Sequence, residues 1–247
     1  MDKMKAAVYI GHGSRSDEGN KQFISFIEEV MAKTPMQVIA YGFLENAKPS
    51  VMEAVESCIW RGASEITVIP VLLLPGIHVN VDIPEILETV KEKHRDVDIL
   101  YGEPIGINSI MVKIIEDRLR EKGFTGSLEE GILLVGHGSR DPLAAAEFEQ
   151  LPVKLQDKMA SVIHTAYITT PPFYAEKVSE LMNSSLRTIY LLPYLLFTGG
   201  FAVKMKERTK EFSRLSSQQE VVVCEPVGFD DRLQALLVKK AEDAVSF

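Results

Sequence analysis

Two histidines and one glutamate in the first half of the chain each follow a short apolar run. His12 lies in VYIGHGSR, Glu45 in YGFLENAKPS and His78 in LLLPGIHVNVDIP. Two imidazoles and a carboxylate suit a borderline divalent metal ion such as Fe²⁺, Co²⁺ or Ni²⁺, and they leave coordination positions open. These residue types therefore indicate a metal site in the first half of the chain.

Each of the three residues also has a purely structural interpretation. A Gly-His-Gly segment between a strand and a helix could be a tight turn, with Ser14 as the cap of the helix. Glu45 alone could be a solvated loop acid, and His78 alone a surface or capping residue. Their occurrence after three successive apolar runs favours the interpretation as a site.

The hydrophobic pattern predicts the elements that would position these residues. Near-continuous apolar runs, typical of parallel strands buried on both faces, cover residues 6–10, 36–44, 65–74 and 97–102. Helical spacing of apolar residues between them predicts helices over 18–33, 49–63, 82–94 and 107–123, with Pro49 and Pro84 near two of the starts. Ligands of such open sheets bind beyond the carboxyl ends of the strands, so the three loops are expected to converge.

The second half of the chain repeats this order. GHGSR recurs with His137 125 positions after His12, and Pro193 lies 123 positions after Pro70. A slowly decreasing offset indicates a duplicated unit with a few deletions in the second copy. We therefore expect two tandem homologous α/β units, each with an open parallel sheet flanked by helices. Residues 1–124 would carry the active site, and residues 125–247 would be a degenerate repeat that forms the opposite wall of the cleft.

The second copy has lost most of the candidate site. His137 is retained, but the offsets place Thr169 opposite Glu45 and Phe201 opposite His78. One histidine is a poor metal site by itself. The repeated GHGSR therefore has a structural component, and the chemistry is expected in the first half.

GHGSR, Glu45 after the second strand and PVLLLPGIHVNVDIP after the third resemble the sirohydrochlorin ferrochelatase and cobaltochelatase family of tetrapyrrole chelatases. The resemblance spans the whole chain, because the long members of that family also carry a degenerate second half with a PYLLFTGG-like segment. It implies an enzyme that inserts Fe²⁺ into sirohydrochlorin to make sirohaem, releasing two protons without nucleotide hydrolysis. No cofactor beyond the substrate metal is implied. The alternative within the family is insertion of Co²⁺ on the cobalamin route.

The resemblance also implies roles for individual residues. His12 resembles the metal-binding base of the family, His78 its second histidine and Glu45 its acidic partner, which makes these three the expected catalytic residues and metal ligands. A neutral imidazole can hold the metal and accept pyrrole protons, and a nearby carboxylate favours both the cation and the protonated ring. The residues expected to contact the macrocycle or its peripheral carboxylates are Ser14, Arg15, Glu45, Leu73, Leu74, Pro75, Gly76, Ile77 and His78.

Composition and charge narrow the class of protein. Hydrophobic residues make up 46% of the chain and charged residues 25%, a balance typical of globular proteins, and no apolar run suggests a signal peptide or a membrane span. The formal net charge of −8 argues against nucleic acid as a partner. Cys58 and Cys224 are expected as small apolar side chains in a reducing cytoplasm. We expect a cytoplasmic protein whose partners are sirohydrochlorin and a divalent metal ion, with no nucleic acid and no membrane.

Two other functions stay open at this point. Phosphoryl transfer would use His12 as nucleophile or base, but the chain lacks a Gly-Lys-Ser/Thr P-loop, and Glu45 and His78 would have no role. A non-catalytic carrier of metal or tetrapyrrole would use the same ligands as a chelatase, and the sequence does not exclude it.

Overall fold

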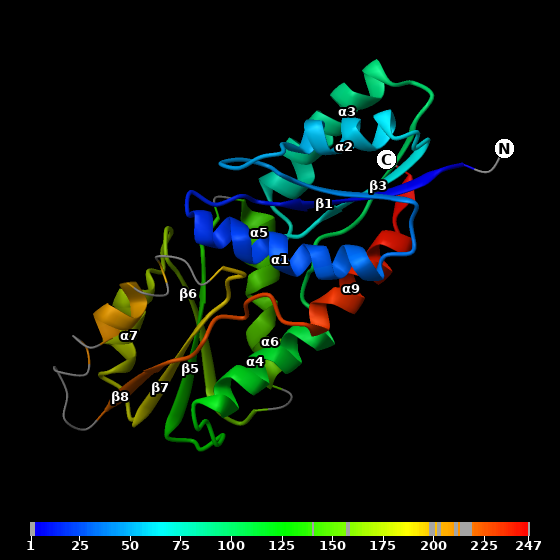
Figure 1. Ribbon diagram of the computed structural model, residues 1–247. Helices are drawn as coiled ribbons and strands as arrows, with labels where there is room; N and C mark the ends of the chain where they lie inside the picture. The colour runs from blue at the N-terminus through cyan, green and yellow to red at the C-terminus, as the bar shows by residue number, and fades with distance from the viewer. Residues whose placement is uncertain are drawn as a thin grey trace. The chain divides into compact units, whose positions relative to one another are not determined.

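The computed structural model describes residues 3–139, 141–156, 159–197, 201, 204–209, 212 and 219–246 (Figure 1). Arg140 of the second GHGSR and residues 198–200 of the PYLLFTGG segment lie outside these ranges. The chain forms two compact units. Unit 1 combines Met1–Gly106 with Phe229–Phe247, and unit 2 consists of Ile107–Gly228. Within the described ranges, no helix combines the length and the apolar character that a membrane span needs.

Unit 1 is built on a sheet with the strand order β2-β1-β3-β4-β9. The first four strands are parallel, as predicted, and the two-residue β9 adds an antiparallel edge that the sequence did not predict. Because β1 lies between β2 and β3, the chain runs from β1 to its neighbour β2 on one side. The next connection then crosses β1 to reach β3 on the other side. The order therefore has a switch point at the carboxyl ends of β1 and β3, where such folds bind ligands. The strands of this sheet are β1 (Lys5–Gly11), β2 (Val38–Phe43), β3 (Glu65–Pro70), β4 (Asp98–Tyr101) and β9 (Val245–Ser246).

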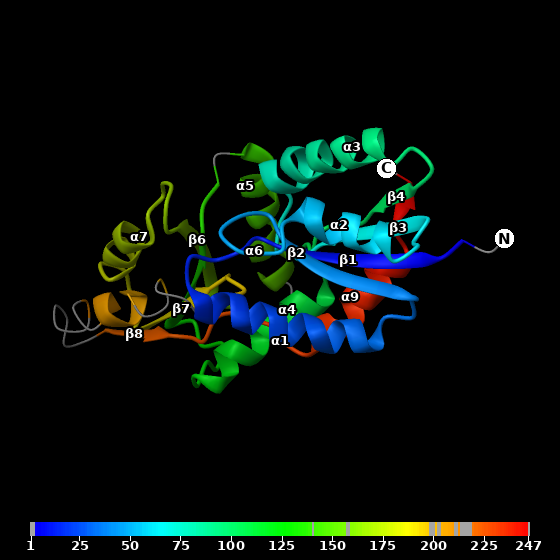
Figure 2. The same ribbon diagram turned by 45° about the horizontal axis from the view of Figure 1, so that its top comes forward.

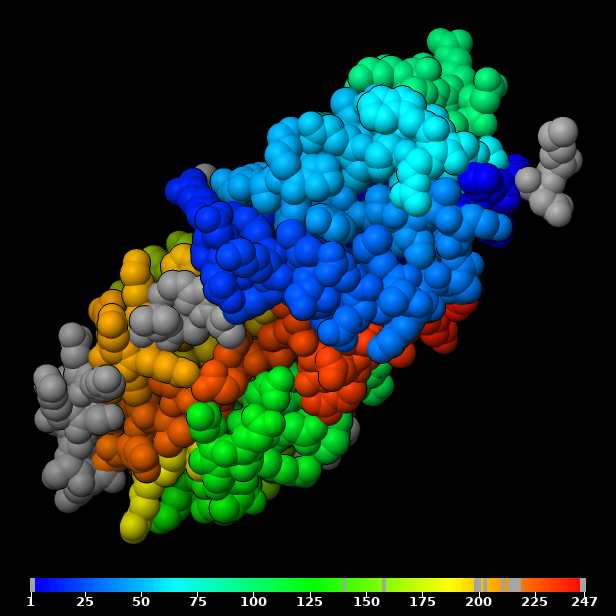
Figure 3. Space-filling model, in the orientation of Figure 1, coloured from blue at the N-terminus to red at the C-terminus, as the bar shows by residue number. Residues whose placement is uncertain are grey.

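Helices cover both faces of the unit 1 sheet. Figure 2 shows α2 and α3 on one face and α1 and α9 on the other. The outer face of α1, blue in Figure 3, is exposed, whereas Phe23, Ile27 and Val30 on its inner face are buried. Fully buried runs in β1 and β3 fit a sheet covered on both sides. The helical segments are α1 (Asp17–Lys33), α2 (Val51–Trp60), the π-turn η1 (His78–Asp82), α3 (Ile83–Lys93) and α9 (Arg232–Glu242).

The third strand is shorter than the predicted range 65–74. Its last pairing is between Pro70 and Ile10, and the chain then leaves the ladder. The carbonyls of Leu72 and Leu73 accept hydrogen bonds from the N–H groups of Ile105 and Gly106 instead. β1 ends at Gly11 and β4 at Tyr101. The apolar run therefore extends past the ends of both neighbouring strands and continues as a loop.

Unit 2 repeats the arrangement with the strand order β6-β5-β7-β8, and all pairings are parallel. The predicted fold class of two homologous α/β units is therefore confirmed. Two short helices, α5 and α6, take the place of the long α1, because a continuous helix would have Pro152 in its interior without a hydrogen bond to Phe148. The elements are α4 (Ser109–Glu121), β5 (Glu130–Gly136), α5 (Pro142–Phe148), α6 (Gln150–Gln156), β6 (Val162–Tyr167), α7 (Tyr174–Leu181), β7 (Thr188–Pro193) and β8 (Glu220–Val223).

The two sequence repeats exchange their last helices. Helix α4 belongs to the first repeat but is part of unit 2, where it packs against β7 and α6. Helix α9 belongs to the second repeat but is part of unit 1, where it packs against α1 and β3. The compact units therefore change at residues 106/107 and 228/229, whereas the repeat predicts a boundary at 124/125. A repeat comparison aligns equivalent helices without showing which sheet each one covers.

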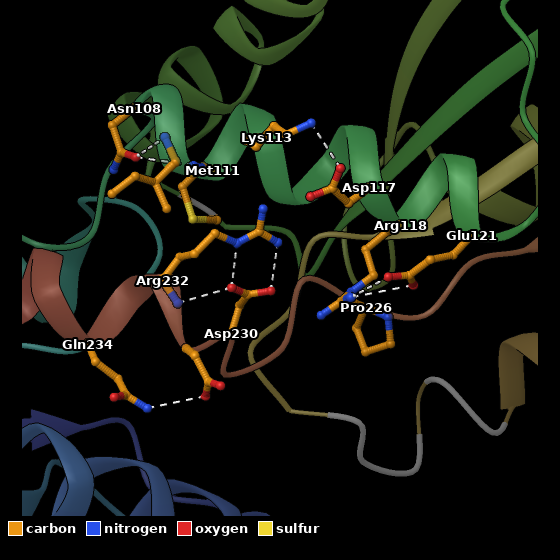
Figure 4. Close-up of polar contacts among 12 residues, drawn as sticks. Asn108, Met111, Lys113, Asp117, Arg118, Glu121, Pro226, Asp230, Arg232 and Gln234 are labelled. Carbon is orange, nitrogen blue, oxygen red and sulfur yellow. Dashed lines mark hydrogen bonds and ion pairs between the residues drawn. The ribbon is translucent and has the colours of Figure 1, made fainter.

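Polar contacts fix each exchanged helix within its own unit (Figure 4). In unit 2, Arg118 of α4 donates from Nε to the carbonyl oxygen of Pro226 at 3.2 Å. In unit 1, the carboxylate of Asp230 accepts from both the backbone and the guanidinium of Arg232 at the start of α9. Further along α9, Gln234 donates to Glu29 of α1 at 2.8 Å.

Candidate active site

The loop after β1 and the loop after β2 are held together by their backbones. The N–H of Glu45 donates to the carbonyl oxygen of His12 at 3.0 Å, and Leu44 donates to Gly11 at 2.9 Å. Gly13 has a φ of +86°, and a Cβ atom there would lie 1.7 Å from the carbonyl oxygen of Glu45. Only glycine fits this position. The Gly-His-Gly segment thus serves a structural purpose and also places His12 beside Glu45.

The structure brings the three sequence-predicted chemical residues together. His12 Nδ1 lies 3.5 Å from Glu45 Oε1. The rings of His12 and His78 lie edge to face, with centroids 4.8 Å apart and an interplanar angle of 84°. The side chains are 36%, 52% and 45% exposed for His12, Glu45 and His78. The cluster stands at the switch point of the unit 1 sheet, within reach of an incoming substrate.

The hydrogen bonds at the two rings decide which nitrogen carries the lone pair. His12 Nδ1 lies 3.0 Å from the carbonyl oxygen of Gly13, which can only accept, so we place the hydrogen on Nδ1. His78 Nδ1 lies 2.6 Å from Oδ2 of Asp82, which as a carboxylate also only accepts. Both rings therefore keep Nε2 as the nitrogen that can bind a metal ion or accept a proton.

The side chains are not arranged as a ready-made metal cage. In the part of the chain that the structure describes, no group of three or more His, Cys, Asp or Glu side chains is placed to hold a metal ion. Glu45 Oε1 contacts His12 at Nδ1, the nitrogen that lies 3.0 Å from the carbonyl oxygen of Gly13. The expected ligand set of His12, Glu45 and His78 stays a prediction.

The expected substrate-binding loop connects β3 to the π-turn. Leu73, Leu74, Pro75 and Gly76 are half-buried, and the side chain of Ile77 is 49% exposed. The backbone of this loop is fixed by Gly106 at one end and by the start of η1 at the other. A rigid, partly exposed apolar segment beside two imidazoles can contact one face of a flat aromatic ligand.

Ser14 and Arg15 have different surroundings. The N–H of Ser14 donates to Asn20 Oδ1 at 2.8 Å, Asn20 Nδ2 donates back to the Ser14 carbonyl at 2.8 Å, and Ser14 Oγ accepts from Ser16 N. The alternative that Ser14 caps the helix is wrong, because α1 begins at Asp17 with Ser16 at the N-cap position. Arg15 is exposed, which fits a solvated surface residue as well as one that meets an anionic ligand, so its role stays a prediction.

Comparison with known proteins identifies the family. The model of the CbiX family matches the chain twice, over residues 6–122 and 131–244. The chain belongs to the CbiX family. Both matches agree with the duplication predicted from the sequence. The resemblance to the tetrapyrrole chelatases is also confirmed, because relatives of this CbiX-family chain are named sirohydrochlorin ferrochelatase or cobaltochelatase.

Three relatives match along almost the whole chain. The chain is 33% identical to the sirohydrochlorin ferrochelatase of Priestia megaterium, covering 100% of this chain and 92% of the relative. It is 30% identical to the sirohydrochlorin ferrochelatase of Bacillus subtilis strain 168, with 98% and 92% covered. It is also 30% identical to the sirohydrochlorin cobaltochelatase of Priestia megaterium, with 98% and 80% covered. Both metal specificities thus occur among relatives of the CbiX-family chain.

A solved structure supports the same relationship. SirB from Bacillus subtilis with Fe³⁺ superposes with a TM-score of 0.88 at 29% identity, covering 97% of this chain and 94% of that one. SirB from Bacillus subtilis subspecies spizizenii in complex with cobalt gives a TM-score of 0.83 at 26% identity, with the same coverage. The fold of this CbiX-family chain is therefore that of SirB.

Unit 2 has a similar arrangement of two rings, formed by different residues. The rings of His137 and Phe201 lie 5.6 Å apart at 74°, matching the pair His12 and His78. The hydroxyl of Thr169 donates to the His137 carbonyl at 2.8 Å. Gly138 has a φ of +98°, and a Cβ atom there would lie 2.7 Å from Thr169 Oγ1 and 2.6 Å from Thr170 Oγ1, much as one at Gly13 would meet Glu45. The GHG geometry is therefore shared by both units, whereas the residues that surround the histidine differ.

Sequence reasoning missed two residues that hold the site. Asn20 clamps the peptide groups of Ser14, and Asp82 accepts from His78. A signal existed for both. The second repeat has Ala145 where the first has Asn20, and His78 and Asp82 have the i, i+4 spacing at which side chains of a helical segment meet.

The two cysteines are buried free thiols, and burial raises the pKa of Cys224 to about 12.

Proposed function

We propose that this CbiX-family protein is a sirohydrochlorin ferrochelatase, which inserts Fe²⁺ into sirohydrochlorin to form sirohaem and releases two protons. The observation that carries the proposal is the pair of imidazoles at the switch point of unit 1. His12 and His78 lie 4.8 Å apart, and each is bonded through Nδ1 so that Nε2 can bind a metal ion. The full-length ferrochelatase relatives from two species support the same activity.

The proposed roles follow from the positions of the side chains. The Nε2 atoms of His12 and His78 hold the substrate metal, and few protein ligands make its release to the macrocycle easy. As the metal passes to the macrocycle, the freed Nε2 atoms of the two imidazoles can each accept one of the two pyrrole protons, which water can then remove because both rings are partly exposed. The carboxylate of Glu45, 3.5 Å from His12 Nδ1, stabilises positive charge on that ring and on the metal. The reaction needs no nucleotide and no resident cofactor.

The macrocycle is proposed to lie against the loop of residues 73–77. Its conjugated ring is flat and apolar, and the half-buried leucines with the exposed Ile77 provide apolar contact. The exposed Arg15 is proposed to bind a peripheral carboxylate, since a guanidinium pairs with two carboxylate oxygens at once. The partners are therefore sirohydrochlorin and a divalent metal ion. We place the reaction in the cytoplasm, where Fe²⁺ and the two free thiols stay reduced.

Cobaltochelatase activity is the second candidate, because the chain also covers 80% of a cobaltochelatase at 30% identity. Imidazole and carboxylate groups accept Co²⁺ as well as Fe²⁺. The ratio of kcat/KM for Fe²⁺ to that for Co²⁺, measured under the same anaerobic conditions, decides between them. A ratio above 1 supports the ferrochelatase, and a ratio below 1 supports the cobaltochelatase.

One assay separates the chelatase from the other functions. The protein is mixed with excess sirohydrochlorin and Fe²⁺ without oxygen, and the absorption spectrum is followed. Many turnovers per protein molecule, lost in the His12→Ala and His78→Ala double variant, are expected for a chelatase. A spectral change that stops at one equivalent would favour a carrier, and no change would contradict the proposal and leave phosphoryl transfer to be tested.

A further inference from the structure

Asp82 makes a close contact with one of the two histidines of the site. His78 and Asp82 are the first and last residues of the π-turn η1, and Asp82 Oδ2 lies 2.6 Å from His78 Nδ1. The π-turn is closed by the N–H of Ile83, which donates to the carbonyl oxygen of His78. This i to i+5 bond is the mark of a π-turn, a form frequent at functional sites.

The π-turn is fixed to the rest of unit 1. The hydroxyl of Tyr101 on β4 donates to the carbonyl oxygen of Val79 at 2.9 Å, and the side chain of Val79 is buried. The carbonyl oxygen of Gly76 accepts from the N–H groups of Val79 and Asn80. The backbone that carries His78 and Asp82 is thus hydrogen-bonded both to β4 and to the preceding loop.

The usual structural role of an aspartate at this place is absent. Asp82 occupies the N-cap position of α3, but its φ of −64° and ψ of −48° are helical, and its side chain makes no capping bond. Its described side-chain hydrogen bond is the one to His78. The carboxylate therefore acts on the imidazole and not on the end of the helix.

We propose that Asp82 is a positioning residue of the metal site. By accepting the Nδ1 hydrogen of His78, it holds the tautomer in which Nε2 carries the lone pair, and it fixes the direction of the ring beside His12. Carboxylate–histidine–metal arrangements orient metal-binding imidazoles in this way. The inference rests on the proposed function only for the identity of the metal substrate and of the reaction.

The second repeat provides an internal comparison. The alignment that places Phe201 opposite His78 places Met205 opposite Asp82, and Met205 is buried in the core of unit 2. The ring of Phe201 still packs edge to face on His137, so the ring contact itself does not need a carboxylate. The carboxylate occurs only in the repeat whose ring has a nitrogen to orient.

The test uses the full chain and three substitutions at this position. Asp82→Met copies the residue of the second repeat and removes the acceptor. Asp82→Asn keeps the size and removes the charge, and Asp82→Glu keeps the carboxylate. Glu88→Gln, on an exposed face of α3, is the matched control for loss of a negative charge. For each variant, Co²⁺ affinity is measured by calorimetry with the metal alone, the tautomer of His78 by ¹⁵N NMR, and stability by thermal unfolding.

Asp82→Met is expected to weaken Co²⁺ binding by about 10- to 100-fold, which is the usual effect of losing such a partner. Its KM for the metal should rise more than its kcat falls, and His78 should change from a single Nδ1–H tautomer to a mixture. Asp82→Asn should lie between Asp82→Met and wild type, Asp82→Glu should retain most of the affinity, and Glu88→Gln should match wild type.

Two results would overturn the inference. One is Co²⁺ binding and a His78 tautomer that are the same in Asp82→Met and wild type. The other is an equal loss in Glu88→Gln. If Asp82→Met fails to fold, the tautomer and the affinity of Asp82→Asn decide in the same way. A wild-type protein that binds Co²⁺ but makes no sirohaem would contradict the proposed function, while the tautomer measurement would still test Asp82.

Discussion

His12 and His78 come from loops after two different strands, and their rings nevertheless meet edge to face with centroids 4.8 Å apart. The strand order of unit 1 produces this pairing, since β1 and β3 are neighbours in the sheet and their carboxyl ends adjoin. The hydrogen bonds at Nδ1 place the hydrogen on that nitrogen in both rings and leave the lone pair on Nε2. The site is therefore a product of strand order and of two local contacts.

The first prediction concerns these histidines. His12→Ala and His78→Ala should each reduce ferrochelatase turnover by about 100-fold or more, the size of a lost acid–base group, with the melting temperature nearly unchanged. Both side chains are half exposed at loop positions and contribute little to the core. His94→Ala is the matched control, because His94 lies at the end of α3 and pairs with Glu56 instead. Turnover close to wild type in either test variant would remove that residue from the site.

The second prediction concerns the repeated motif. His137→Ala should change turnover by less than about threefold, well under the effect of losing an acid–base group. Its neighbours Thr169 and Phe201 supply no imidazole or carboxylate. Steady-state assays of His137→Ala beside His12→Ala provide the measurement. An equal loss in both variants would show that the second unit takes part in the chemistry.

The sequence predicted the part of this site that depends on strand ends. Apolar runs of strand length located β1, β2 and β3, and the rule for parallel sheets then brought His12, Glu45 and His78 to one edge. The contacts of Asn20 and Asp82 were missed because they depend on the directions of side chains in the first turn of α1 and in the π-turn η1. The exchange of α4 and α9 was missed for a different reason. An amphipathic pattern shows that a helix has an apolar face, but not which of two similar sheets that face covers.

The third prediction concerns Glu130, a buried carboxylate at the start of β5. Burial alone would raise its pKa, but Oε2 accepts from Thr125, Gly126 and Ser127, and the net effect lowers the pKa below the ordinary value of 4.5. A lowered folded-state pKa contributes stability that is fully present above pH 4.5 and is lost as the pH falls through the folded-state value.

Glu130→Gln should therefore reduce the free energy of unfolding by about 1.5–3 kcal/mol at pH 7, the range for hydrogen bonds to a charged group. The difference from wild type should shrink when urea unfolding is repeated at a pH well below the ordinary value of 4.5, because protonation of the carboxylate removes the charged acceptor. Glu129→Gln is the neighbouring control, since its ion pair with Arg187 is exposed and contributes little. A difference that is the same at both pH values would contradict this account.

The fourth prediction concerns the exchanged helices. A fragment of residues 1–124 contains α4, although in the whole chain α4 packs in unit 2 and not on the sheet of unit 1. The same fragment lacks α9, which packs against α1 and β3. Leu233, Leu237 and Ala241 of α9 are buried in the whole chain, and burial of each leucine stabilises by about 1.5–3 kcal/mol. The fragment should therefore unfold at a lower temperature than the whole chain.

A peptide of residues 229–247 added to this fragment should restore much of the lost stability, because it supplies the missing cover of α1 and β3. A peptide with Leu233→Asp and Leu237→Asp is the control and should have no effect. Without a peptide, the fragment should dimerise as its concentration rises, because α4 of a second copy is the sequence equivalent of α9. Thermal unfolding and light scattering measure both effects. A monomeric fragment as stable as the whole chain, and indifferent to the peptide, would show that unit 1 does not need α9.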